Sequence, residues 1–118
     1  MGQRIVVALG GNALIKPGET GTTAQQLSCA HQVGRVLSAL PADTELVVTH
    51  GNGPQVGRIL LRSDLCAAEV PPVPLDVAVA ATQGQIGLML QQALSSKLGR
   101  AVSAVLTRVL VSAEDPDF

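Results

Sequence analysis

Two short segments of glycine and asparagine, each placed directly after an apolar run, constrain the fold of this chain more than any other feature. Gly10-Gly11-Asn12 follows the run 4–9, and Gly51-Asn52-Gly53 follows the run 45–49. The near-continuous apolar character of the first run is typical of a strand buried on both faces. The stretch between the runs is long enough for the crossover that joins parallel strands, whose carboxyl ends open at the edge where α/β sheets bind ligands. We therefore expect an α/β fold in which both segments form loops at one edge of the sheet.

Helix signals fill the stretches between and after these two runs. Thr22 or Thr23, followed three residues later by Gln25 or Gln26, offers a capping box for a first helix. Asp76 is suited to cap a later and longer helix. The elements expected besides the two runs are helices over about 22–40, 54–69 and 76–98 and a third buried strand over 101–111.

The composition argues against several classes of protein. Hydrophobic residues make up 47% of the chain and charged residues 14%, the net charge is −1, and Phe118 is the single aromatic residue. Without a basic face or aromatic platforms for base stacking, we do not expect nucleic-acid binding. The sequence has neither an apolar run of the roughly 18 residues that span a bilayer nor signal-peptide organisation, so we expect a cytoplasmic protein. Cys29 and Cys66 are isolated and fall in expected helices, which favours reduced core thiols over a disulfide or a metal site.

The chain holds fewer elements than a doubly wound sheet usually has. At 118 residues it is the size of one domain. Three strands are nevertheless few, because sheets usually have about five or six. After the third expected strand the sequence reaches Phe118 without a helix to cover that strand. We therefore expect residues 1–118 to be the amino-terminal portion of something longer.

The two glycine segments match no common nucleotide-binding motif. The chain has no G-x-x-x-x-G-K-[ST] run, and Val56 occupies the position that a dinucleotide fingerprint gives to its third glycine. Each segment alone is compatible with an ordinary turn. Together they favour oxyanion binding by backbone N–H groups and a helix amino terminus, with the Asn12 and Asn52 amides acting on a carbonyl or carboxylate. Positioning and charge neutralisation of this kind suit phosphoryl transfer.

Two further side chains are candidates for an accessory role at this edge. His50 immediately precedes the second segment and is suited to act as an acid, a base or a phosphate ligand; a hydrogen-bonded histidine at a strand end is the alternative. Lys16 is the only lysine near the first segment and has the reach to contact a phosphate; a solvated loop lysine is the alternative.

Three stretches of the sequence resemble carbamate kinase, of the amino acid kinase superfamily. They are residues 6–14 (VVALGGNAL), 49–57 (THGNGPQVG) and the stretch from Pro74-Leu75-Asp76 to Gln83-Gly84-Gln85-Ile86-Gly87. The resemblance covers essentially the whole chain, up to Asp115-Pro116. It implies an open three-layer αβα sandwich with a mainly parallel sheet, of which this chain is the amino-terminal, substrate-side part. It also implies a homodimer to which the helix over 76–98 contributes.

The same resemblance implies an activity and a role for each glycine segment. The family transfers a phosphoryl group reversibly between ATP and carbamate with Mg²⁺, usually forming ATP from carbamoyl phosphate and ADP, often at the end of arginine fermentation. Carried over by position, Gly10, Gly11 and Asn12 hold the transferred phosphoryl group. Gly51, Asn52 and Gly53 hold the carbamate.

The sequence departs from the wider superfamily at one position near the first segment. Many superfamily members have a lysine where this chain has Ala8, whereas carbamate kinases supply a lysine from further along the chain. We expect that lysine, together with the nucleotide site, beyond Phe118, so the 118-residue chain alone is expected to be inactive. Two alternatives remain open: a kinase of the same superfamily with another small acceptor, such as a carboxylate or a phosphate monoester, and a non-catalytic small α/β domain that binds an anion.

Overall fold

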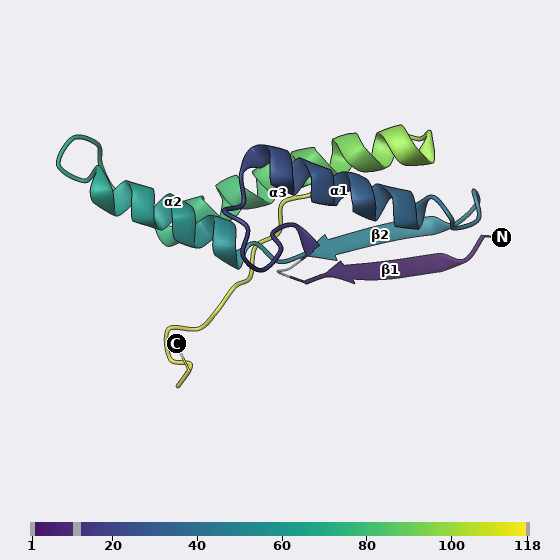
Figure 1. The fold of residues 1–118 in the computed structure, drawn as a ribbon. Helices are drawn as coiled ribbons and strands as arrows, with labels where there is room; N and C mark the ends of the chain where they lie inside the picture. The colour runs from purple at the N-terminus through teal and green to yellow at the C-terminus, as the bar shows by residue number, and fades with distance from the viewer. Residues whose placement is uncertain (1, 11–12, 118) are drawn as a thin grey trace.

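The computed structural model describes residues 2–10 and 13–117. The elements, in chain order, are β1 (Arg4–Leu9), α1 (Thr23–Leu37), β2 (Glu45–His50), α2 (Gly53–Leu65) and α3 (Leu75–Leu98). Figure 1 shows the two strands side by side beneath a layer formed by α1 and α3, with α2 extending away from the end of β2. The described residues thus form a sheet with helices on one face.

The sheet is a parallel pair in unbroken register. Arg4 pairs with Glu45, and the ladder continues to Leu9, which pairs with His50. α1 forms the crossover between the two strands, as the sequence predicts. Exposure alternates along both strands, and on the outer face the side chains of Val6 and Val47 remain 65% and 48% exposed. The prediction that the first strand is buried on both faces is therefore not met among the described residues, because no helix covers the outer face.

Local capping signals determine where the helices begin and end. Thr22 caps α1 in a complete capping box with Gln25, which is one of the predicted pairs. The cap of α3 is Pro74, so the prediction that Asp76 caps this helix is wrong; Asp76 lies in the first turn, where its charge favours the helix dipole. The second helix ends at Leu65, earlier than predicted.

The core lies between α1, α3 and the inner face of the sheet. Helices α1 and α3 approach each other closely at Gly34 of α1, where a built Cβ would lie 3.1 Å from the Ala93 carbonyl oxygen of α3. Val7, Leu9 and Val48 pack against the core from the strands. The buried cluster consists of Leu14, Cys29, Ala30, Leu37, Ile86, Met89, Leu90, Ala93 and Leu94. The helical layer therefore packs on β1 and β2 and holds the two strands in place up to the edge where both end.

The third strand predicted over 101–111 is not formed. These residues run in an extended path without strand pairing, and the Leu110 side chain is 98% exposed. A strand requires a backbone neighbour, and here the backbone is bonded by side chains instead: Gln91 Nε2 donates to the Val102 carbonyl at 2.7 Å, and Gln83 bonds Thr107. Apolar residues alone did not make this segment a strand.

Two smaller expectations are also resolved. Both cysteines are free thiols; Cys29 lies in the core as predicted, but Cys66, at the exposed end of α2, does not. Among the described residues, no helix combines the length and apolar character needed to cross a membrane.

Candidate functional site

The two glycine loops begin at the same edge of the sheet, as the sequence predicts. Leu9 and His50 are the last paired residues of β1 and β2, and each is followed at once by a glycine. The Gly51 N–H donates to the Leu9 carbonyl at 3.3 Å, which extends the contact between the strands into the loops. The chain therefore leaves both strands side by side.

The described residues next to Gly11 and Asn12 are held by a hydrogen bond and by burial. The Ala13 N–H donates to the Gly10 carbonyl at 2.9 Å, and Leu14 and Ile15 are buried immediately afterwards. Gly11 and Asn12 lie outside the described residues. Their predicted part in holding a phosphoryl group therefore stays a prediction, and Gly10 is the member of this segment whose surroundings are known.

The second loop leads directly into α2. Asn52 is the residue before the helix, Pro54 lies in its first turn, and the Val56 N–H donates to the Asn52 carbonyl at 3.0 Å. The N–H groups of Gly53 and Gln55 lie in the first turn, where a helix offers no acceptor and carries a partial positive charge. This end of α2 is suited to bind an anion.

The Asn52 side chain makes a contact that the sequence did not indicate. Its Nδ2 donates to the Thr82 hydroxyl at 2.8 Å and to the Val79 carbonyl at 3.2 Å, so both amide hydrogens are directed to α3. The amide nitrogen thus ties the second loop to the core. A contact between Asn52 and a substrate stays a prediction for the side-chain oxygen and the backbone.

Gly10, Gly51 and Gly53, the described glycines of the two loops, have no structural requirement to be glycine. Gly10, Gly51 and Gly53 do not have positive φ angles, and a Cβ built on any of them meets no described atom within 4 Å outside its chain neighbours. Neither backbone conformation nor packing explains these residues. Open space above bare backbone is what a small oxyanion needs to reach N–H groups closely.

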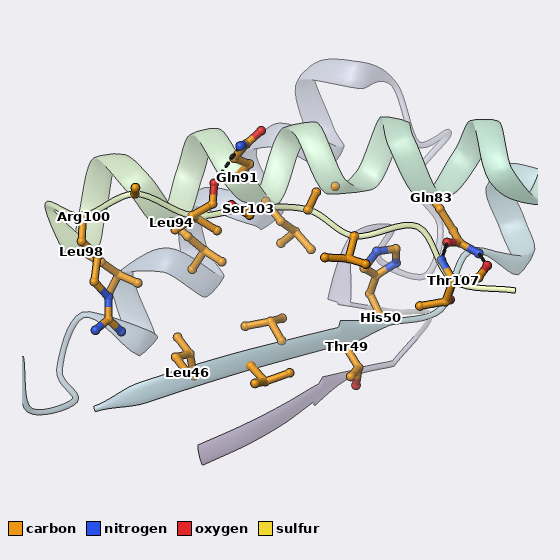
Figure 2. A pocket seen from close by; sticks show the side chains of 18 residues that line it. Leu46, Thr49, His50, Gln83, Gln91, Leu94, Leu98, Arg100, Ser103 and Thr107 are labelled. Carbon is orange, nitrogen blue, oxygen red and sulfur yellow. Dashed lines mark hydrogen bonds between the residues drawn. The ribbon is translucent and has the colours of Figure 1, made fainter. Parts of the chain in front are cut away.

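The two accessory candidates lie differently from each other. His50 is half-buried, with Nδ1 3.4 Å from the Gly51 carbonyl, and Figure 2 shows its ring pointing from the end of β2 toward the extended segment. Lys16 is exposed; its backbone N–H donates to the Glu19 carboxylate at 3.1 Å, and its carbonyl accepts from the Glu19 N–H at 3.1 Å. No hydrogen bond joins either side chain to Gly10, and their roles stay predictions.

A cavity lies beside the glycine loops rather than over them. It has a volume of about 600 Å³ and runs along β2, between that strand, α3 and residues 100–107 (Figure 2). Leu46, Val48, Leu90 and Leu94 line it, and the described loop glycines, Gly10, Gly51 and Gly53, do not. It is an apolar space left where the extended segment fails to pair with β2, and it lacks convergent charges for an anionic substrate.

Buried glutamines form a second arrangement that the sequence did not reveal. Gln55 of α2 donates through Nε2 to Gln26 Oε1 of α1 at 2.9 Å, and both residues are at least nine-tenths buried. A glutamine after a glycine-proline turn reads as solvent-facing, and no local pattern marks it as the partner of a residue on another helix. The helix that carries the second loop is therefore joined by this hydrogen bond to the helix that follows the first.

The described residues do not form a metal site on their own. Within this part of the chain, no group of three or more histidine, cysteine, aspartate or glutamate side chains is placed to hold an ion. Magnesium in kinase sites is usually held by one or two carboxylates together with substrate phosphates and water. The donors at this edge of the sheet are backbone N–H groups, which bind anions and not cations.

The sequence matches a known protein family over nearly its whole length. The model of the amino acid kinase family matches residues 3–115, nearly the whole chain. The chain belongs to the amino acid kinase family. Within this family the mixed helices and parallel sheet, with two glycine loops at one edge, agree with the predicted fold class.

Several relatives with similar sequences are carbamate kinases. The chain is 41% identical to carbamate kinase of Thermococcus kodakarensis over 98% of its length and 47% identical to carbamate kinase of Escherichia coli over 97%. It spans 40% and 38% of those two proteins. The similarity therefore concerns well under half of each curated relative.

Solved structures agree with the sequence comparison. A protein of Aeropyrum pernix superposes with a TM-score of 0.88 at 38% identity, over 98% of this chain and 39% of that one. Carbamate kinase from Giardia lamblia bound to AMP-PNP gives a TM-score of 0.74 at 38% identity, over 80% of this chain and 34% of that one. The fold of this chain is therefore similar to part of two larger solved structures, one of which is a carbamate kinase.

Proposed function

We propose that the protein to which this chain belongs transfers a phosphoryl group between ATP and carbamate. One observation carries the proposal: two loops at one sheet edge present three described glycines, Gly10, Gly51 and Gly53, that neither backbone conformation nor packing requires. The similarity to carbamate kinases at 41% and 47% identity supports carbamate as the acceptor. Carbamoyl phosphate and ADP are the substrates of the reverse reaction.

Each loop has a distinct role in this proposal. Gly10, Gly11 and Asn12 hold the transferred phosphoryl group, and Gly51, Asn52 and Gly53 hold the carbamate. The amino terminus of α2 supplies N–H groups and partial positive charge near the carboxylate, which stabilise negative charge without a proton transfer. Because the loops leave adjacent, paired strands, the two groups are held next to each other, as direct phosphoryl transfer needs.

The nucleotide and its metal complete the proposal. Kinases of this kind use Mg²⁺ bound to the phosphates of ATP or ADP to neutralise their charge. The described residues do not fit a Mg²⁺ site of their own, so we assign no step to the ion. Lys16 and Lys97 are the only lysines among these 118 residues. We propose that the catalytic lysines and the nucleotide contacts come from outside them, and that residues 1–118 alone are inactive.

We propose that the outer face of α3 forms part of a homodimer interface. Val77 and Leu88 are 51% and 54% exposed, and Ala81 and Gly84 are exposed between them. These residues follow helical spacing, so they form one stripe on the helix. A Cβ built on Gly84 meets no described atom within 4 Å, which leaves room for a second helix to approach closely.

The setting of the reaction is also part of the proposal. The resemblance of the sequence to carbamate kinases supports a cytoplasmic enzyme of arginine metabolism that forms ATP. The acceptor is a small molecule, and no nucleic acid or membrane takes part.

The test is the reaction itself, in the protein expressed from the complete reading frame that contains these residues. ATP formed from ADP and carbamoyl phosphate is measured with Mg²⁺, with acetyl phosphate as the matched alternative donor. The proposal expects a kcat/KM at least tenfold higher for carbamoyl phosphate, since a site built to bond an amide group discriminates against a methyl group by about that factor or more. Equal use of both donors, or no ATP from carbamoyl phosphate, contradicts it.

A further inference from the structure

A carbonyl group between the first glycine loop and α1 is bonded by two side chains from different helices. The Gly21 carbonyl accepts from Gln26 Nε2 of α1 at 2.9 Å and from Arg58 Nη1 of α2 at 2.7 Å. Arg58 lies 37 residues further along the chain. Its guanidinium carries a charge, and charge-assisted hydrogen bonds are shorter and stronger than neutral ones.

Gly21 is the residue at which this contact is possible. Its φ angle is +66°, which a residue with a side chain rarely adopts. A Cβ built there would lie 2.5 Å from Arg58 Nη1. The positive φ favours glycine at this buried position, and a Cβ would displace the flexible end of the Arg58 side chain from its place against the backbone.

A second bond runs parallel to the first. Gln55, one turn before Arg58 on α2, donates to Gln26, and Gln26 in turn donates to Gly21. Gln26 and Gln55 are 3% and 5% exposed, so water competes little for these bonds. The start of α2 is thus joined to the end of the connection between β1 and α1 by two routes.

These bonds join the connection that follows the first glycine loop to the helix that begins in the second. Gly21 ends the connection that begins at Gly10, and Arg58 belongs to the helix that begins at Gly53. We infer that Arg58 is a positioning residue, which acts through the Gly21 carbonyl to fix the separation of the two glycine loops. The inference rests on the proposed function, because that separation sets the distance between the phosphoryl group and the carbamate.

The inference predicts which kinetic constant changes. Each loop keeps its own N–H groups when Arg58 is lost, so each substrate still binds. The alignment of the two groups, however, depends on the separation of the loops, and small misplacements reduce the rate of a positioned reaction strongly. Loss of Arg58 should therefore lower kcat and leave KM nearly unchanged.

The experiment compares three variants in the protein from the complete reading frame. Arg58→Ala removes the contact, and Arg58→Lys keeps a charged donor of similar reach. Arg62→Ala is the matched control, because Arg62 is an exposed arginine one turn further along α2, with no side-chain hydrogen bond to the described residues. Arg58→Gln, which keeps an amide donor, replaces Arg58→Ala should that variant not fold. Steady-state kinetics and backbone hydrogen exchange of residues 13–22, without substrate, are measured for each.

The expected result is a kcat lowered on the order of tenfold in Arg58→Ala, with KM within about twofold, partial recovery in Arg58→Lys, and faster exchange of residues 13–22. Arg62→Ala should match the unaltered protein.

Two kinetic outcomes overturn the inference: Arg58→Ala kinetics equal to those of Arg62→Ala, or a loss of kcat that Arg58→Lys does not relieve. If the unaltered protein does not use carbamoyl phosphate, the proposed function fails. The exchange comparison then decides the inference by itself, and unchanged exchange in Arg58→Ala refutes it.

Discussion

The segments 45–50 and 101–111 share a bias toward valine and leucine but have different structures. Both are apolar and rich in β-branched residues, and both lie near the same helix, α3. The first is β2, with every residue paired to β1 and its inner face packed against the core. The second runs along β2 without pairing, its backbone bonded by glutamine side chains and its apolar side chains largely exposed. The difference teaches that a strand is defined by the neighbour it pairs with, because the backbone ladder and the covering layer supply the stabilisation.

The largest expected contrast between the packed region and the extended segment is in the cost of losing an apolar side chain. Ile86 is fully buried in α3, and Ile86→Ala in the 118-residue chain should cost about 2–5 kcal/mol of unfolding free energy, since it leaves a cavity. Leu110 is 98% exposed, and Leu110→Ala should change that free energy by less than about 0.5 kcal/mol. Chemical denaturation measures both. Similar losses at the two positions would show that the extended segment is buried after all.

The next contrast concerns the loop at the carboxyl end of β2. Asn52→Ala removes two hydrogen bonds to α3 and leaves the wholly buried Thr82 hydroxyl with one donor fewer, so it should cost about 1–2 kcal/mol. Thr82→Val removes one of the same bonds from the other side. A double-mutant cycle measured by thermal unfolding should give a coupling of at least about 0.5 kcal/mol. Strictly additive losses would mean that Asn52 does not hold this loop to α3.

The attachment of the extended segment should be weaker. Gln83 bonds both the N–H and the carbonyl of Thr107, at 2.9 and 3.2 Å, on the exposed side of α3. Gln83→Ala should cost no more than about 1 kcal/mol and raise hydrogen exchange at Thr107 selectively. Gln92, an exposed glutamine of the same helix, supplies the control, and Gln92→Ala should leave that exchange unchanged. Equal exchange in the two variants would argue against the glutamine contact.

The smallest effect is expected where the two strands meet solvent. Arg4 and Glu45 form an ion pair at 2.7 Å between β1 and β2, with side chains 74% and 61% exposed. Exposed pairs contribute little and are screened by salt. Glu45→Gln should therefore cost less than about 0.5 kcal/mol at low salt and nothing measurable at 1 M salt, by the same denaturation assay. A larger cost that persists in salt would mean that the β1–β2 pairing depends on this charge.

The sequence predicted those features that depend on local signals. The parallel pair followed from two β-branched runs joined by a helical crossover, and Thr22 with Gln25 marked the start of α1. The convergence of the loops then followed from the topology of parallel strands. Each of these features requires only residues close in sequence or a general rule of sheet geometry.

What the sequence did not predict depends on residues far apart in the chain. The Asn52 amide is directed to α3 because Thr82 happens to lie opposite, and Gln55 is buried because Gln26 offers it a partner. No spacing in the sequence marks such pairs. The strand predicted over 101–111 failed for the same reason, since apolar residues indicate a tendency to pair but not the presence of a partner.

The most direct measurement compares two glycines of α2 in the protein from the complete reading frame. Gly53 lies in the second loop and Gly57 one turn later, and a Cβ at either meets no described atom within 4 Å. We propose that Gly53 lacks a side chain so that carbamate can approach the backbone. Gly53→Ala should therefore lower kcat/KM for carbamoyl phosphate by at least about tenfold without loss of stability. Gly57→Ala should leave kcat/KM unchanged. Unaltered kcat/KM in Gly53→Ala would contradict the assignment of this loop to the substrate.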